Sequence, residues 1–230
     1  MSPYPPFPLF TFIGFAIHAL VFYAIGIRFL KRWNDKTFFL MGVGSFLDGV
    51  NFTIILVLFF LFPNSLAKSN IFLFNASIIV PFAVLSFVGA LVYFWEHSRK
   101  FLPLYFIIGS VLNIYLFIST LEQFRAVPFE ASYVHPAFPA LIGQSQSAGI
   151  ISSVVIGLFF FYNAFLSTLF IKRRALILGF ACILEAISTV YWTSSTPGVY
   201  IFTHTVGPIA SLMIAYAIFA YAIPHSEKAT

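Results

Sequence analysis

Long apolar stretches separated by short polar segments make up almost the whole chain. Each stretch is close to the roughly 20 residues that a helix needs to cross the hydrocarbon core of a bilayer. The polar segments between the stretches are short and hold most of the charged residues. This pattern predicts one all-α domain over residues 1–230, an integral membrane bundle of seven transmembrane helices. We expect the helices at 8–30, 37–62, 71–95, 101–121, 148–171, 175–195 and 200–223.

The composition agrees with a membrane location. The chain is 60% hydrophobic and 8% charged, whereas soluble domains carry about 25% charged residues. Such a chain has too few charged side chains to cover a water-facing surface. We therefore expect a multi-pass protein of the cell membrane, surrounded by lipid. The single cysteine, Cys182, excludes a framework of disulfides within the chain.

The basic residues are unevenly divided between the two ends of the predicted helices. Of the twelve lysines and arginines, all but Lys68 and Arg125 fall on one side of the predicted bundle. Cytoplasmic loops carry an excess of such residues. The pattern therefore predicts a cytoplasmic C-terminus and an N-terminus outside, and it explains the net charge of +5 without nucleic acid as a partner. The residues on the predicted cytoplasmic side are Arg28, Lys31, Arg32, Lys36, Arg99, Lys100, Lys172, Arg173, Arg174 and Lys228.

Several polar side chains lie well inside the predicted helices and need a reason to be there. Intramembrane ionisable groups are costly and normally face the bundle interior or water. Asp48 and Glu185 each lie about 10 or 11 residues from the predicted cytoplasmic end of their helix, or about 15–17 Å at the helical rise. We expect the two carboxyls at similar depth in an interior polar layer. The polar residues within spans include His18, Asp48, Asn51, Asn75, Glu185 and His204.

Two interpretations of this layer stay open. In one, Asp48 and Glu185 are protonated and hydrogen-bonded, and serve only to fix contacts between helices. In the other, they form a proton- or cation-coupled site or the counter-ion of a ligand. The sequence does not decide between a structural and a functional layer.

The two histidines raise a separate hypothesis, since histidines on facing helices hold haem in membrane proteins. His18 lies about ten residues from the outer end of its span and His204 four or five, so their depths differ by about 8 Å. Hydrogen-bonded packing histidines are the alternative. Within the predicted spans, Cys182 and Glu185 are the only His, Cys, Asp or Glu residues with the i, i+3 or i+4 spacing of metal ligands, and one such pair is too few, so we expect no metal site.

Two stretches carry a resemblance to a known family. "NASIIVPFAVLSF" (75–87) resembles a third helix in which a counter-ion acid lies six residues before a proline. "HTVGPIASLMIAYAIFAYAI" (204–223) resembles a last helix that carries a retinal lysine. With seven predicted helices, short loops and an outside N-terminus, the chain resembles the microbial rhodopsins. The alignment puts Asn75 at the counter-ion position, Ser211 at the lysine position and Gly207 at the position of the second acid.

The chain departs from that family at the positions that bind retinal. The last predicted span has no lysine, so a retinal Schiff base cannot form there. The sixth helix also lacks the Trp-x-x-Tyr-Pro pattern. The resemblance therefore implies an opsin-shaped bundle without covalent retinal. Its interior pocket would lie near Asp48, Asn75, Glu185 and Ser211, and a non-covalent polyene is one ligand it could hold.

The function predicted from these observations is non-enzymatic. An interior polar pocket favours a small-solute or proton-linked transporter, or a receptor-like bundle that binds a lipophilic molecule. The alternative is a structural or accessory subunit of a larger membrane assembly such as a respiratory complex, because the loops are short and the exterior is rich in aromatic residues. A redox subunit that binds haem or a pigment is a further alternative. Partners other than the bilayer would be further membrane subunits or a second copy of the chain.

Overall fold

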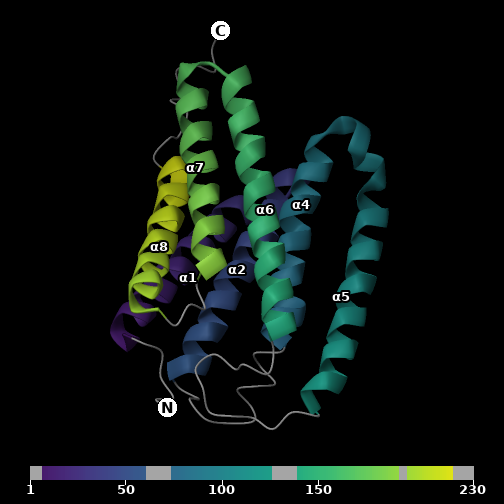
Figure 1. Cartoon of the computed structure of the whole chain (residues 1–230). Helices are drawn as coiled ribbons and strands as arrows, with labels where there is room; N and C mark the ends of the chain where they lie inside the picture. The colour runs from purple at the N-terminus through teal and green to yellow at the C-terminus, as the bar shows by residue number, and fades with distance from the viewer. Residues whose placement is uncertain (1–6, 61–73, 126–138, 192–195, 220–230) are drawn as a thin grey trace.

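The computed structural model describes residues 7–60, 74–125, 139–191 and 196–219. In these residues the protein is all-helical, with seven α-helices, a π-helical turn, a 3₁₀ turn and no strand. Figure 1 shows the helices as a bundle whose members run alternately up and down. Lys68, Lys228 and the predicted helix ends at 61–62, 71–73, 192–195 and 220–223 lie outside the described residues. The elements are α1 (Pro8–Leu30), α2 (Lys36–Phe60), η1 (Asn75–Ile79), α4 (Val80–Phe94), η2 (Glu96–Phe101), α5 (Leu102–Arg125), α6 (Pro139–Leu166), α7 (Leu169–Tyr191) and α8 (Pro197–Phe219).

Six of the seven helices close a ring. Packed neighbours follow one another in the order α1, α2, α4, α6, α7 and α8, and α8 packs back against α1. The remaining helix, α5, packs against α4, η1 and η2 and stands at the edge of the bundle (Figure 1). Within the described residues, four of the helices hold a stretch long and apolar enough to cross a membrane: α1, α2, α6 and α8.

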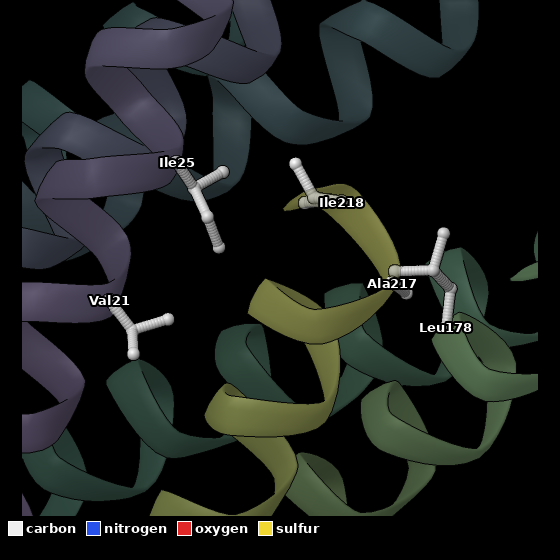
Figure 2. Packing of buried hydrophobic residues seen from close by; sticks show 5 residues of the cluster. All are labelled: Val21, Ile25, Leu178, Ala217 and Ile218. Carbon is white, nitrogen blue, oxygen red and sulfur yellow. The ribbon is translucent and has the colours of Figure 1, made fainter. Parts of the chain in front are cut away.

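A small apolar cluster fastens the first helix to the last two. Val21 and Ile25 of α1 lie against Ala217 and Ile218 of α8, with Leu178 of α7 beside them (Figure 2). All five side chains are buried, although these helices are far apart in the sequence. The ring therefore closes through side-chain packing between the start and the end of the chain.

Glycines set the close approach of α1 and α2. A Cβ atom on Gly26 would lie 2.9 Å from the backbone nitrogen of Phe46, and one on Gly42 would lie 2.9 Å from that of Leu30. Such backbone contacts leave no room for a side chain, as is common where small residues line helix contacts in membranes. The start of α2 is fixed by Asp35, whose carboxylate accepts the backbone N–H of Thr37 at 2.8 Å.

The bounds of two helices differ most from those predicted from the apolar runs. α6 spans 139–166 rather than 148–171, and α7 begins at Leu169 rather than at 175. The helix is interrupted at Ser167 and Thr168, between α6 and α7. There the Ser167 hydroxyl donates to the carbonyl oxygen of Asn163, and the Thr168 carbonyl accepts the N–H of Lys172. Hydropathy alone cannot locate such a break, because serine and threonine side chains satisfy the local backbone without a change in apolar character.

The entry to α4 is a π-helical turn. Residues Asn75–Ile79 form this turn, and Pro81 follows it as the second residue of α4. Proline has no N–H to give to the carbonyl four residues earlier. The wider turn immediately before Pro81 accommodates the missing bond, and π-helical turns of this kind are frequent at functional sites.

Candidate functional site

A partly open cavity of about 540 Å³ lies within the six-helix ring. Residues of α1, α2, α4, α6, α7 and α8 line it, and no described residue of α5 does. The lining runs lengthwise through the bundle, from Arg174 and Thr37 at one end to His204 and Gly14 at the other. Of the four residues that the sequence placed near an interior pocket, Asp48 and Glu185 line this cavity, whereas Asn75 and Ser211 do not.

A hydrogen-bonded cluster of three side chains lies at the wall of this cavity. The Ser211 hydroxyl donates to Glu185 Oε1 at 2.6 Å and lies 2.6 Å from His18 Nδ1. His18 Nδ1 and Glu185 Oε1 are 3.7 Å apart, so the serine oxygen lies between them. We call these residues the His18–Ser211–Glu185 cluster. It joins α1, α7 and α8, three helices that the sequence could not assign as neighbours.

Packing holds the His18 ring in place. Its face stacks on the ring of Phe52, with centroids 4.4 Å apart and planes 10° from parallel. Gly207 lies on the other side. A Cβ atom there would be 2.9 Å from His18 Nε2 and 2.7 Å from Ser188 Oγ. Only glycine leaves room for the imidazole, and the small residue at 207 is therefore part of what positions the cluster.

His204 lies near the same cavity but belongs to a different set of contacts. Its ring stacks on Tyr200 with centroids 3.9 Å apart, and its Nδ1 is 3.0 Å from the Tyr200 carbonyl oxygen. The Ser188 hydroxyl donates to the carbonyl of Thr203 beside it. Both histidines line one cavity, each with protein partners on its ring. In the described part of the chain, no group of three His, Cys, Asp or Glu residues is placed to hold a metal ion.

The asparagines of the predicted layer form a second pair. Asn75 Nδ2 of η1 donates to Asn51 Oδ1 of α2 at 2.7 Å, and Asn75 Oδ1 is buried without a hydrogen bond among the described residues. Asp48, one turn before Asn51, lines the cavity together with Glu185. Ser211 and Asn75 do not line the cavity themselves. Each is hydrogen-bonded to a residue that does, Ser211 to Glu185 and Asn75 to Asn51.

The other half of the cavity has a different chemistry. Its walls are aromatic and aliphatic, with edge-on contacts such as Phe94 against Phe159 at 5.2 Å. We call the half around His18, Asp48, Asn51 and Glu185 the polar half, and the half around Phe29, Phe38, Phe94 and Phe160 the aromatic half. Arg174 lines the cavity at the far limit of the aromatic half.

The sequence analysis did not propose several of the polar lining residues, among them Arg174 and Ser188. Arg174 was counted as one of three loop charges. Its spacing to Glu185 is a signal that could have found it, since 11 residues make about three helical turns and bring both to one face. Leu178 and Cys182, which fall on that face between them, line the cavity as well.

Comparison with known proteins gives no relative. No family model matches the chain, and no curated protein or solved structure is significantly similar to it. The resemblance to the microbial rhodopsins therefore stays a prediction.

Proposed function

We propose that the protein crosses the membrane seven times, with the N-terminus outside and the C-terminus in the cytoplasm. Four helices that are apolar enough to span a membrane support this topology. So does the placement of charge. Alternating helices bring the α1–α2 junction, η2 and the start of α7 to one end of the bundle (Figure 1), and these segments hold nine basic residues of the predicted cytoplasmic set.

Cysteine labelling on intact cells tests this topology. In a Cys182→Ser background we expect a membrane-impermeant maleimide to label Gly198→Cys, at the proposed outer end of α8. Asn34→Cys, between α1 and α2, should label only after the cells are opened. Both positions are exposed in the bundle, and a Cβ atom at 198 has open space around it. The reverse labelling pattern would refute the orientation.

We further propose that the cavity binds a lipophilic ligand, so that the protein is a receptor-like or carrier bundle rather than an enzyme. The observation that carries this proposal is the cavity itself. Its volume falls within the range of about 300–1,000 Å³ seen for ligand sites, and such sites combine apolar walls with a few placed polar groups. The aromatic half supplies the walls, and the His18–Ser211–Glu185 cluster with Asp48 supplies the polar groups.

A photoreactive long-chain alcohol that carries a diazirine and an alkyne tests ligand binding in the cavity. Crosslinking at lining residues should saturate and be competed by unlabelled hexadecanol, whereas crosslinking on the lipid-facing surface should do neither. Ile156→Trp, which fills the cavity wall, should remove the saturable part. Its neighbour Val155 is 42% exposed, so Val155→Trp is the matched control and should leave that part intact. Saturable labelling that survives Ile156→Trp would refute the proposal.

Proton-linked transport is a second candidate, supported by the position of Ser211. Its hydroxyl bridges a carboxyl and an imidazole, so a protonated His18 can give its Nδ1 proton to Ser211 Oγ while Ser211 gives its own to Glu185 Oε1. Proteoliposomes that contain a pH-sensitive dye would test this relay. Ser211→Ala should abolish proton flux and Ser211→Thr, which keeps a hydroxyl, should retain it. Equal flux in all three proteins would exclude the relay.

A further inference from the structure

Arg174 is a cation inside the limits of the cavity rather than at the open surface. Its side chain is partly buried and lines the aromatic half, whereas its neighbours Lys172 and Arg173 are exposed. A guanidinium group in such surroundings loses hydration, which is unfavourable unless an anion replaces the water. Arg174 therefore faces the cavity, whereas Lys172 and Arg173 lie on the surface.

The charges around Arg174 make an anion more favourable still. Arg28 and Arg32, both of its own sign, add electrostatic repulsion to the cost of its burial. These two place their guanidinium groups over the rings of Phe219 and Phe38, at 4.7 and 5.0 Å. The carboxylate of Asp35, at the same end of the bundle, accepts hydrogen bonds from backbone N–H groups at the start of α2. Within the described residues, Arg174 forms no ion pair with an acidic side chain.

From Arg174 the cavity continues along α7 with a mostly apolar lining. Arg174, Leu178, Cys182 and Glu185 follow one face of α7, and 11 residues separate the first from the last, or about 16 Å along the axis. That length matches an extended chain of roughly 13 carbon–carbon bonds, since such bonds are about 1.5 Å long and meet at tetrahedral angles. A single alkyl or polyene chain would fill this path between the cation and the polar half.

We propose that the ligand of the cavity is a single-chain amphiphilic anion, such as a long-chain carboxylate. Its head pairs with Arg174 at the cytoplasmic end, and its chain extends through the aromatic half towards the His18–Ser211–Glu185 cluster. Guanidinium binds a carboxylate through two parallel hydrogen bonds, which fixes the orientation of the chain as well as its affinity. This inference rests on the proposal that the cavity binds a lipophile, and it names the class and direction of that ligand.

The test compares two photoreactive probes of equal chain length, a fatty acid and the corresponding alcohol, with the protein in nanodiscs of zwitterionic phospholipid. Hexadecanoate or hexadecanol serves as the unlabelled competitor, and its half-displacing concentration is measured. We expect Arg174→Gln to weaken the acid at least about tenfold and to leave the alcohol unchanged, with partial recovery in Arg174→Lys. Arg173→Gln, one residue away and exposed, should change neither value. Slow reaction of buried Cys182 with a thiol dye reports that each variant is folded.

The outcomes separate the two proposals. Equal binding of acid and alcohol, or an equal loss of both in Arg174→Gln, would overturn the anion inference while the cavity stays a lipophile site. Loss of acid binding in Arg173→Gln to the same extent would also overturn it, because the cytoplasmic surface charge would then be responsible. If Ile156→Trp changes neither probe, the ligand site itself is refuted. Displacement of the acid by added phosphatidylglycerol would assign the Arg174 site to bilayer lipid instead.

Discussion

The two halves of the cavity are built on different principles. In the polar half, side chains hold one another by hydrogen bonds with short, defined distances, such as the two 2.6 Å contacts of Ser211. In the aromatic half, phenylalanine rings meet edge to face or at a tilt, as Phe29 and Phe38 do at 5.6 Å. A hydrogen-bonded network in an apolar surrounding is costly when one member is lost, whereas ring contacts tolerate substitution.

This difference assigns a separate task to each half. The polar half is a fixed arrangement that joins α1, α7 and α8 and offers directional contacts to a ligand. The aromatic half offers volume and apolar surface without a preferred direction. We therefore expect changes in the polar half to affect stability strongly, and changes in the aromatic half to have little effect on it.

The largest expected effect comes from Gly207→Leu. The first side-chain atom would already meet Ser188 Oγ and His18 Nε2 at under 3 Å, so the cluster and the α8 backbone must shift. We expect a loss of about 3 kcal/mol in the free energy of unfolding. The rate at which Cys182 reacts with a thiol dye on heating measures this. Gly198→Leu, where no atom lies within 4 Å of the new Cβ, is the control. Equal melting temperatures for both variants would contradict the role given to Gly207.

Ser211→Ala should have the next largest effect. It removes the hydroxyl between His18 and Glu185 and leaves both without their shared partner, which we expect to lower stability by about 2 kcal/mol. Thr205→Ala on the exposed face of the same helix removes a hydroxyl that bonds only its own backbone and is the control. The same dye assay measures both. A loss in Ser211→Ala no greater than in Thr205→Ala would mean that the cluster adds nothing to stability.

The Asn51–Asn75 pair should contribute less. A double-mutant cycle with Asn51→Leu and Asn75→Leu isolates the 2.7 Å bond between them. We expect a coupling free energy of about 0.6 kcal/mol, the average for hydrogen bonds between membrane helices. The four melting curves of the cycle give this value. Additive losses from the two single variants would show that the pair contributes no coupling.

The smallest effect is expected in the aromatic half. Phe94→Leu removes the edge-to-face contact with Phe159 but keeps an apolar side chain of similar reach, at a position that is 48% exposed. The expected loss is about 0.5 kcal/mol, and saturable binding of the photoreactive alcohol should persist. If Phe94→Leu instead destabilised the protein as much as Ser211→Ala, the contrast between the two halves would be wrong.

Much of the fold could be predicted from the apolar runs. The helical class and the approximate position of each helix follow from runs of bilayer length, and the small residues of "GVGSF" (42–46) lie where α2 meets α1 and α4. Glu185, Asp48 and His18 could be selected because ionisable groups are rare in such runs. Ser211 was selected only through the resemblance to an opsin, since a serine in an apolar helix is not unusual.

The contacts between helices and the start of α7 could not be predicted, because the hydrophobic pattern of a single helix does not contain them. The approach of His18 to Glu185 requires that α1 and α7 both pack against α8, which follows from ring closure rather than from any one helix. Arg174 was treated as a loop residue because a hydropathy boundary was set at the last charge, whereas a turn at Ser167 moves the helix start to Leu169. Charged residues in the first turns of a helix can still face its interior side.

The place of α5 also carries a consequence for the direction of the chain. In the ring, α4 and α6 are neighbours that run the same way, so the chain must return to its starting end between them (Figure 1). α5 makes that return outside the ring, as a crossover helix does between parallel strands. It gives the cavity no described lining residue. Yet without this return α6, α7 and α8 would enter inverted, and Arg174 would lie at the opposite end of the bundle from the α1–α2 junction.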